Sequence, residues 1–148
     1  MRAEAWNNPN VMIGGSDAGA HLDRMCGAPY TTAFLADCIR GRRLVSMERA
    51  IQLMTDTPAR FFGLRGRGRL AEGWIADVAV FDPATVANAD IVLRRDLPGD
   101  CGRLYADAIG GEYVFVNGRR TLTAGETSGD LPGAVLRSGR DTDTVTVH

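Results

Sequence analysis

Hydrophobic residues change their spacing near residue 65, which divides the sequence into a helical part and a strand-rich part. Residues 11–15 form a short apolar run between polar residues and glycines, and this pattern predicts a buried strand. Apolar side chains then recur at helical spacing over 34–39. A second helix is expected to begin at Ser46, a suitable N-cap residue, and a third opens at 57–58, where proline fits the first turn.

Beyond a charged, glycine-containing connector at 66–69, the apolar period becomes that of β-strands. Residues 77–82 predict one strand and residues 113–116 predict another. The dipeptide Asn117-Gly118 follows directly and predicts a tight turn into a partner strand at about 120–123, since Asn-Gly between two β-prone runs is a strong hairpin signal.

The other segments of this part carry weaker patterns. Residues 88–111 are irregular, with a turn expected at 98–100. From about residue 125 the chain is rich in Gly, Ser, Thr and Asp, so we expect a loosely ordered or disordered tail.

Composition and charge limit the classes of protein that remain. The chain has 148 residues, of which 45% are hydrophobic and 24% are charged, proportions typical of a soluble globular protein. All seventeen basic residues are arginine, and the net charge is −1, so we expect neither nucleic acid nor a membrane surface as a partner. The length excludes a complete (β/α)₈ barrel, which needs roughly 250 residues.

Cysteine usage and the N-terminus favour a cytoplasmic location. The three cysteines, Cys26, Cys38 and Cys101, form no CxxC pair and are expected to be reduced thiols. The first ten residues contain no apolar stretch typical of a secretory signal, and no apolar run reaches the roughly 18 residues of a membrane span.

The segment with the strongest chemical signal is GGSDAGAH, residues 14–21, because it places an aspartate directly after the expected strand. In α/β barrels, this edge of the sheet presents the catalytic groups. A carboxylate there can bind a divalent metal or act as a general acid or base. Asp17 is therefore the candidate catalytic residue, and His21 lies on the same loop.

Simpler interpretations of this loop stay open. Ser-Asp after two glycines is also an ordinary turn or helix-cap sequence. A single histidine such as His21 often serves as a hydrogen-bonded structural residue. A complete metal site made of Asp17, His21, Asp23 and Cys26 is disfavoured, because this spacing fits no known zinc pattern and crowds the ligands into one short loop.

Four segments in this order resemble the C-terminal end of the metal-dependent amidohydrolase superfamily. They are GGSDAGAH (14–21), MTDTPARFFGL (54–64), GRLAEGWIADVAVFDP (68–83) and YVFVNGRRTLTAGETSGDLPGAVLR (113–137). Within the superfamily, the chain is most similar to the D-aminoacylase or N-acyl-D-amino-acid deacylase type.

The resemblance implies an α/β fold that corresponds to a fragment of a larger protein. Residues 1–65 would be the last βα unit and helices of a (β/α)₈ barrel. Residues 66–137 would be part of a small β-sandwich domain, and residues 138–148 a disordered tail. Because barrel and sandwich strands would be missing, we expect the isolated chain to be marginally stable, aggregation-prone or oligomeric.

The resemblance also implies a chemistry, namely zinc-dependent hydrolysis of a non-peptide amide such as that of an N-acyl amino acid. Asp17 falls on the family's aspartate that binds metal and acts as general acid and base. His21 lies near the expected substrate position. Arg24 is the nearby candidate to hold a substrate carboxylate, although it does not align cleanly with the family's arginine.

The family's histidine ligands would lie upstream of residue 1, and this sequence holds only two histidines, His21 and His148. We therefore expect the chain alone to be inactive, with a separate chain or a longer protein supplying the rest of the barrel. Two alternatives stay open. One is a non-catalytic remnant or interaction module of the same fold, and the other is a hydantoinase-like or dihydroorotase-like ring opener.

Overall fold

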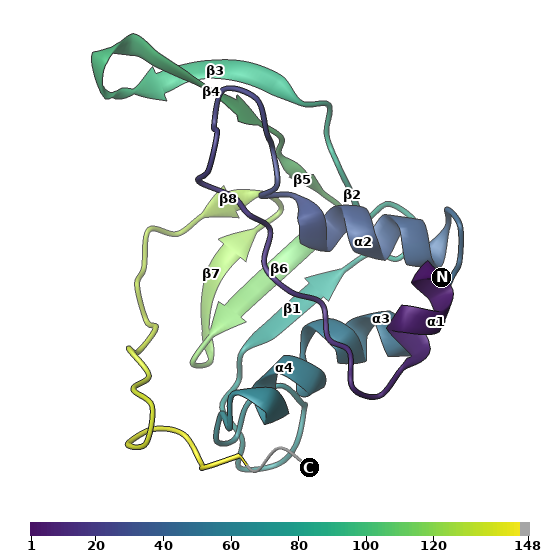
Figure 1. Cartoon of the computed structure of the whole chain (residues 1–148). Helices are drawn as coiled ribbons and strands as arrows, with labels where there is room; N and C mark the ends of the chain where they lie inside the picture. The colour runs from purple at the N-terminus through teal and green to yellow at the C-terminus, as the bar shows by residue number, and fades with distance from the viewer. Residues whose placement is uncertain (146–148) are drawn as a thin grey trace.

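The computed structural model describes residues 1–145, and its helices precede its strands along the chain (Figure 1). The helices are α1 Arg2–Asn7, α2 Tyr30–Ile39, α3 Met47–Met54 and α4 Asp56–Phe61. The strands are β1 Val78–Phe81, β2 Ala87–Asn88, β3 Val92–Leu97, β4 Cys101–Tyr105, β5 Ala108–Ile109, β6 Gly111–Val116, β7 Arg119–Thr123 and β8 Glu126–Thr127, with a 3₁₀ turn η1 at Pro98–Asp100. The chain therefore combines helices and sheet, as the α/β prediction requires.

The helices form where capping residues and apolar spacing predict them. The Ser46 side chain accepts a hydrogen bond from the backbone N–H of Arg49 at 3.2 Å, which confirms the N-cap of α3. Helix α2 ends at Ile39, as expected, and Pro58 lies in the first turn of α4. The short helix α1 was not predicted from the sequence.

The main sheet has four antiparallel strands in the order β1-β6-β7-β8. The turn between β6 and β7 is the expected one, because Asn117 and Gly118 both adopt positive φ, 48° and 75°. The strands predicted over 77–82, 113–116 and 120–123 are confirmed as β1, β6 and β7.

The irregular segment over 88–111 contains more regular structure than the sequence predicts. β2 pairs with β5, and β3 pairs with β4 in a hairpin that projects from the body at the top of Figure 1. The guanidinium groups of Arg94 and Arg103 lie 3.8 Å and 4.7 Å from the centre of the Tyr105 ring. These polar and aromatic contacts stabilise a hairpin that lacks the alternating apolar pattern of a half-buried strand.

A small core joins the helices to the start of the strand region. Leu35 and Cys38 of α2 pack with Ala50 of α3 and with Val86, which precedes β2. Arg40 donates hydrogen bonds to the backbone carbonyls of Pro83 and Val86 and so fastens the same two regions. Burial raises the pKa of the Cys38 thiol, which fits a packing role rather than a reactive one.

The strand predicted over 11–15 is not formed, so this prediction is wrong for the chain as described. Residues 11–17 carry neither helix nor strand, and Val11 donates its N–H to the Asn8 carbonyl at 3.2 Å in a turn that follows α1. A parallel barrel strand needs hydrogen-bonding neighbours on both edges. No sheet of residues 1–145 provides such a neighbour.

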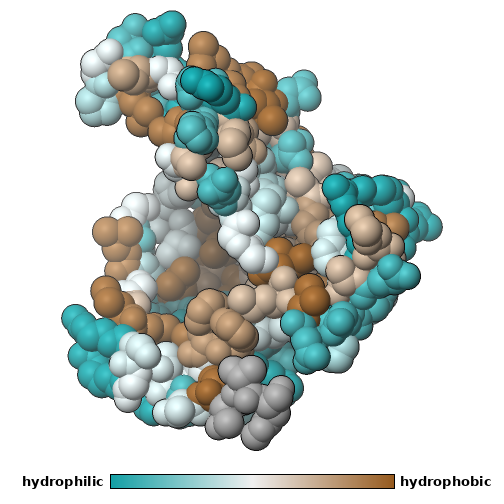
Figure 2. Space-filling model, viewed as in Figure 1, coloured by the Kyte–Doolittle hydropathy of each residue, from teal (hydrophilic) through white to brown (hydrophobic). Residues whose placement is uncertain are grey.

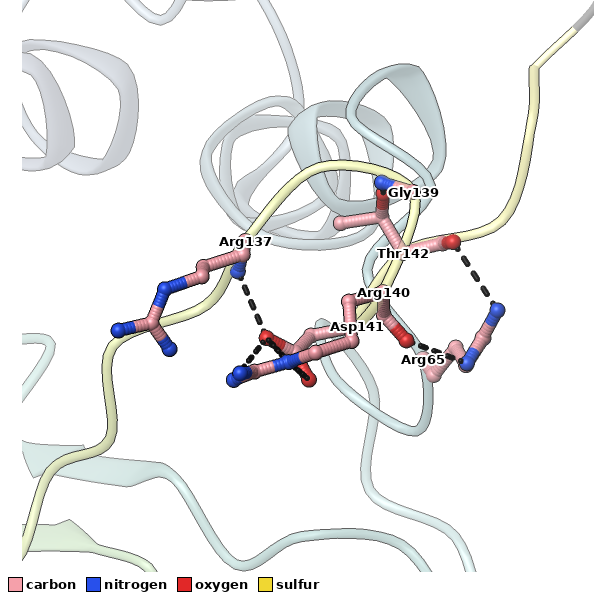
Figure 3. A network of polar contacts seen from close by, with 6 residues as sticks. All are labelled: Arg65, Arg137, Gly139, Arg140, Asp141 and Thr142. Atoms are coloured by element: carbon pink, nitrogen blue, oxygen red, sulfur yellow. Dashed lines mark hydrogen bonds and ion pairs between the residues drawn. The ribbon is translucent and has the colours of Figure 1, made fainter.

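Residues 137–143, which we call the C-terminal strap, are held against the end of α4, whereas composition predicts a loosely ordered tail. Figure 3 shows that Arg65 donates hydrogen bonds to the carbonyls of Arg140 and Thr142, at 3.1 Å and 3.0 Å. Its Nε also binds the Asp143 carboxylate at 2.7 Å. Residues 146–148, including His148, lie outside the described part of the chain.

The chain exposes a large surface for its mass. Its accessible area is 10106 Å², whereas a compact monomer of 15.9 kDa exposes about 7,400 Å². Phe61 and Phe62, which follow one another at the end of α4, are 55% and 57% exposed. None of the helices over residues 1–145 is long and apolar enough to cross a membrane.

Candidate functional site

The candidate residues lie on one closed loop over 16–27, which we call the Asp17 loop. Its two ends meet at Gly27, where an added Cβ would overlap the carbonyl oxygen of Ser16. The loop then continues into α2, since Tyr30 donates its N–H to the Gly27 carbonyl at 3.1 Å. A glycine at this neck lets the two backbone segments approach closely.

Asp17 and His21 both adopt the left-handed backbone conformation, with φ of 55° and 51°. Aspartate and histidine adopt this conformation more readily than most non-glycine residues, and four other non-glycine residues among 1–145 do so as well: Arg43, Asp100, Asn117 and Ala124. Two bonds inside the loop support them: Ala18 donates its N–H to the Ser16 hydroxyl, and Arg24 donates its N–H to the His21 carbonyl. The positive φ at these two positions was not predicted from the sequence.

The structure brings Asp17, His21 and Arg24 onto the same loop, and all three are exposed. The Arg24 guanidinium lies 3.3 Å from the Asp23 carboxylate, in a pair that is open to solvent on both sides. The three side chains are therefore open to solvent, and none of them lines either of the two hollows described below. Asp17 carries a carboxylate, His21 an imidazole and Arg24 a guanidinium group.

The described residues do not by themselves build a metal centre. Over residues 1–145, no three side chains of His, Cys, Asp or Glu gather closely enough to hold an ion. The described residues can therefore supply one carboxylate, that of Asp17, to a metal ion, but they do not form a complete zinc site by themselves.

An apolar hollow of about 400 Å³ adjoins the start of the Asp17 loop. The 12–15 run lines one side, and Tyr30, Met54, Pro58 and Phe62 line the other. Figure 2 shows hydrophobic side chains gathered around a hollow in the face that Figure 1 presents. The apolar VMIGG run is the sequence signal for this hollow. It lines the hollow as irregular backbone and not as a strand.

A second hollow, of about 350 Å³, lies between α4 and the connector that follows it. The buried carboxylate of Asp56 binds Arg60 and Arg69, each at 3.0 Å, and Arg69 also lies over the Trp74 ring. Arg67 pairs with Asp77, the residue directly before β1. The arginines of the basic connector over 66–69 are therefore paired with carboxylates of the chain itself, and they link α4 to the beginning of the strand region.

Comparison with known proteins identifies the chain's relatives. The sequence model described as the amidohydrolase family matches residues 2–122, a range that includes the whole Asp17 loop. The chain belongs to the amidohydrolase family.

Two curated relatives of this amidohydrolase chain come from Alcaligenes xylosoxydans xylosoxydans. An N-acyl-D-aspartate deacylase is 35% identical over 113 residues, which cover 73% of this chain and 20% of that enzyme. A D-aminoacylase is 42% identical over 124 residues, which cover 82% of this chain and 24% of that enzyme. The amidohydrolase chain thus resembles the D-aminoacylase type and spans about a fifth to a quarter of the length of these relatives.

Solved structures point to the same type. The crystal structure of a D-aminoacylase aligns with a TM-score of 0.50 and 31% identity, over 69% of this amidohydrolase chain and 19% of that chain. A D-aminoacylase variant in complex with copper chloride aligns with a TM-score of 0.53 and 32% identity, over 69% and 20% of the two chains. Metal binding is therefore a property of the structural relatives.

Proposed function

We propose that this chain is part of an amidohydrolase that cleaves the amide bond of an N-acyl-D-amino acid. The observation that carries the proposal is the family match over residues 2–122, which includes the loop where Asp17 is exposed. The curated relatives named as deacylases of acylated D-amino acids support this substrate class.

In this proposal Asp17 is a ligand of a zinc centre and the general acid and base of hydrolysis, while His21 and Arg24 bind substrate. The copper-bound structural relative supports a metal centre in proteins of this type. When bound, the metal would polarise the amide carbonyl and lower the pKa of a bound water. Exposed Arg24 would attract the substrate carboxylate, because a guanidinium forms charge-assisted hydrogen bonds to it.

We also propose how the chain fits into the complete enzyme. Residues 1–65 would be the end of a (β/α)₈ barrel, residues 66–137 part of a small β-sandwich, and 138–148 an appended tail. The remaining metal ligands and the strands beside 11–15 would come from polypeptide outside these 148 residues. The large exposed surface of the chain and the apolar hollow beside the Asp17 loop support the binding of this further polypeptide. A cytoplasmic location is supported by three free cysteines, Cys26, Cys38 and Cys101.

The test compares hydrolysis of N-acetyl-D-amino acids by the chain alone and by the chain together with the polypeptide encoded directly upstream in its genome. Released amine measures turnover, and elemental analysis measures bound metal. We expect turnover and zinc only in the combination. Asp17→Ala should lower turnover at least about a hundredfold, the usual contribution of a general acid or base.

The control is Asp130→Ala, which removes an exposed carboxylate between β8 and the C-terminal strap and should leave turnover unchanged. Turnover that survives Asp17→Ala, or a combination that hydrolyses no N-acyl-D-amino acid, would overturn the proposal. Zinc-dependent turnover by the chain alone would overturn the claim that the other ligands lie outside it.

A ring-opening amidohydrolase is the second candidate. A dihydroorotase from Endomicrobium trichonymphae is 46% identical to the chain, but over only 39 residues, which cover 26% of this chain and 9% of that enzyme. The deacylase matches cover about three times as much of the chain, 73% and 82% against 26%, and therefore favour the deacylase. Parallel assays with dihydroorotate and an N-acetyl-D-amino acid distinguish the two.

A further inference from the structure

The Asp17 loop contacts the projecting β3–β4 hairpin through a backbone hydrogen bond. Leu104 of β4 donates its N–H to the carbonyl of Leu22 at 2.8 Å. Leu22 follows His21 directly and lies at the far side of the loop from its neck at Gly27. Figure 1 shows the loop lying directly beneath the hairpin.

The geometry of the hairpin explains why this N–H is available. Leu104 lies opposite Leu93 in the antiparallel pair. Residues of such pairs alternate between those that bond to each other and those whose N–H groups point outward. The bond to Leu22 identifies Leu104 as an outward-pointing position, so its N–H is not used to hold the hairpin together.

We propose that strand β4 positions the Asp17 loop, with Leu104 as the positioning residue through its backbone N–H. The importance of this positioning for catalysis rests on the proposed function of Asp17. The loop has no helix or strand of its own between Asp17 and Met25, so its conformation depends on contacts at its two ends. The closed neck at Gly27 fixes one end of the loop, and the bond from Leu104 fixes the other, with Asp17 and His21 between them.

The hairpin is suited to this role because it is stiffened by its own contacts. Arg103 binds the Asp96 carboxylate across the hairpin at 2.7 Å. Arg94 binds Asp107 at 2.6 Å, and both arginines lie against the Tyr105 ring. The strand that supports the loop therefore keeps its shape although it projects from the body.

The test removes the Leu104 N–H in the 148-residue chain by Leu104→Pro and observes His21 by NMR. The sequence contains only two histidines, so its imidazole signals are few, and His21→Gln assigns them. We expect the His21 signal to shift and the amides of Arg24 and Met25, which donate to the His21 carbonyl, to exchange about fivefold faster with solvent, as the loss of one hydrogen bond predicts.

Leu93→Pro is the matched control, because it places proline at the paired position, where the N–H points to the opposite edge of the hairpin. It should leave the His21 signal and both amides unchanged. Equal effects of the two proline variants, or no effect of Leu104→Pro in a folded chain, would overturn the proposal.

A reciprocal variant decides the question if Leu104→Pro fails to fold. Gly27→Ala opens the neck of the loop, and we expect it to speed exchange of the Leu104 amide about fivefold while the Arg103 and Tyr105 amides, which face β3, keep their rates. Gly14→Ala, where an added Cβ meets open space, is its control. An unchanged Leu104 amide would contradict the proposal.

These measurements need neither substrate nor metal. If the protein shows no deacylase activity, these measurements can still show whether the hairpin positions the loop. If they show that it does not, the proposed deacylase activity is still tested separately by the hydrolysis assay.

Discussion

Asp37, near the end of α2, shows how one residue couples stability to pH. Its carboxylate accepts hydrogen bonds from Arg42 Nε at 2.9 Å and from a terminal guanidinium nitrogen at 2.6 Å. These bonds hold the pKa of Asp37 below its ordinary value of 3.8. The stabilisation is therefore complete above that value and is lost as pH falls through the lowered pKa.

We predict that Asp37→Asn lowers the melting temperature at neutral pH by a small amount, because the pair lies near the surface. The difference from the unmodified chain should shrink as the pH falls below 3.8 and disappear once the pH lies below the lowered pKa, where Asp37 is protonated in both the folded and the unfolded state. Thermal unfolding across this pH range measures it, with Glu72→Gln, an exposed acid, as control. A deficit that persists unchanged in acid would contradict the assignment.

At the scale of elements, Arg65 decides whether the C-terminal strap stays on α4. Its guanidinium bonds to three groups of the strap, and lysine cannot reproduce this forked geometry. We predict that Arg65→Lys lowers the free energy of unfolding by about 1–2 kcal/mol and speeds proteolytic cleavage after Arg140. Urea unfolding and timed proteolysis measure both effects.

Arg119→Lys, at an exposed position of β7, is the control for the same change of side chain. If both variants unfold and are cleaved alike, the strap is not held by Arg65.

For the whole molecule, the exposed area predicts association. The chain exposes about 2,700 Å² more than a compact monomer of its mass would, and a specific interface buries about 1,200–2,000 Å². Phe61 and Phe62 form an edge-to-face pair in the exposed surface, with ring centres 5.0 Å apart. We predict that the chain self-associates at micromolar concentration and that replacing both phenylalanines by serine raises the required concentration at least about tenfold.

Sedimentation over a range of concentrations measures this association. Leu70→Ser, at a residue that is 81% exposed in the connector region, should leave it unchanged. A clean monomer with a sharp, cooperative thermal transition would contradict the prediction.

Turns and helix caps, which depend on neighbouring residues, were predicted correctly from the sequence. Asn117-Gly118 adopts the expected turn, Ser46 caps α3, and η1 forms where Pro98 and its neighbours predicted a turn. The sequence also placed Asp17 and His21 on one loop, because they lie only four positions apart. Spacing alone could not predict that both residues adopt positive φ, since contacts around the loop hold that conformation.

Elements that depend on distant partners could not be predicted in the same way. The 11–15 run reads as a strand, but a strand exists only beside another strand, and residues 1–145 provide none there. Conversely, β3 and β4 have weak strand patterns and form because Arg94, Arg103 and Tyr105 contact one another across the hairpin.

The sequence by itself therefore determined the local turns and caps, the separation of a helical from a strand-rich part, and the resemblance to amidohydrolases, because each is encoded in residues that are close together or in fixed order. Only the tertiary structure decided how the Asp17 loop is supported and how the strap is fastened. The bonds responsible join Leu22 to Leu104 and Arg65 to Asp143. Their formation depends on the path of the chain between the partners, which residue spacing does not specify.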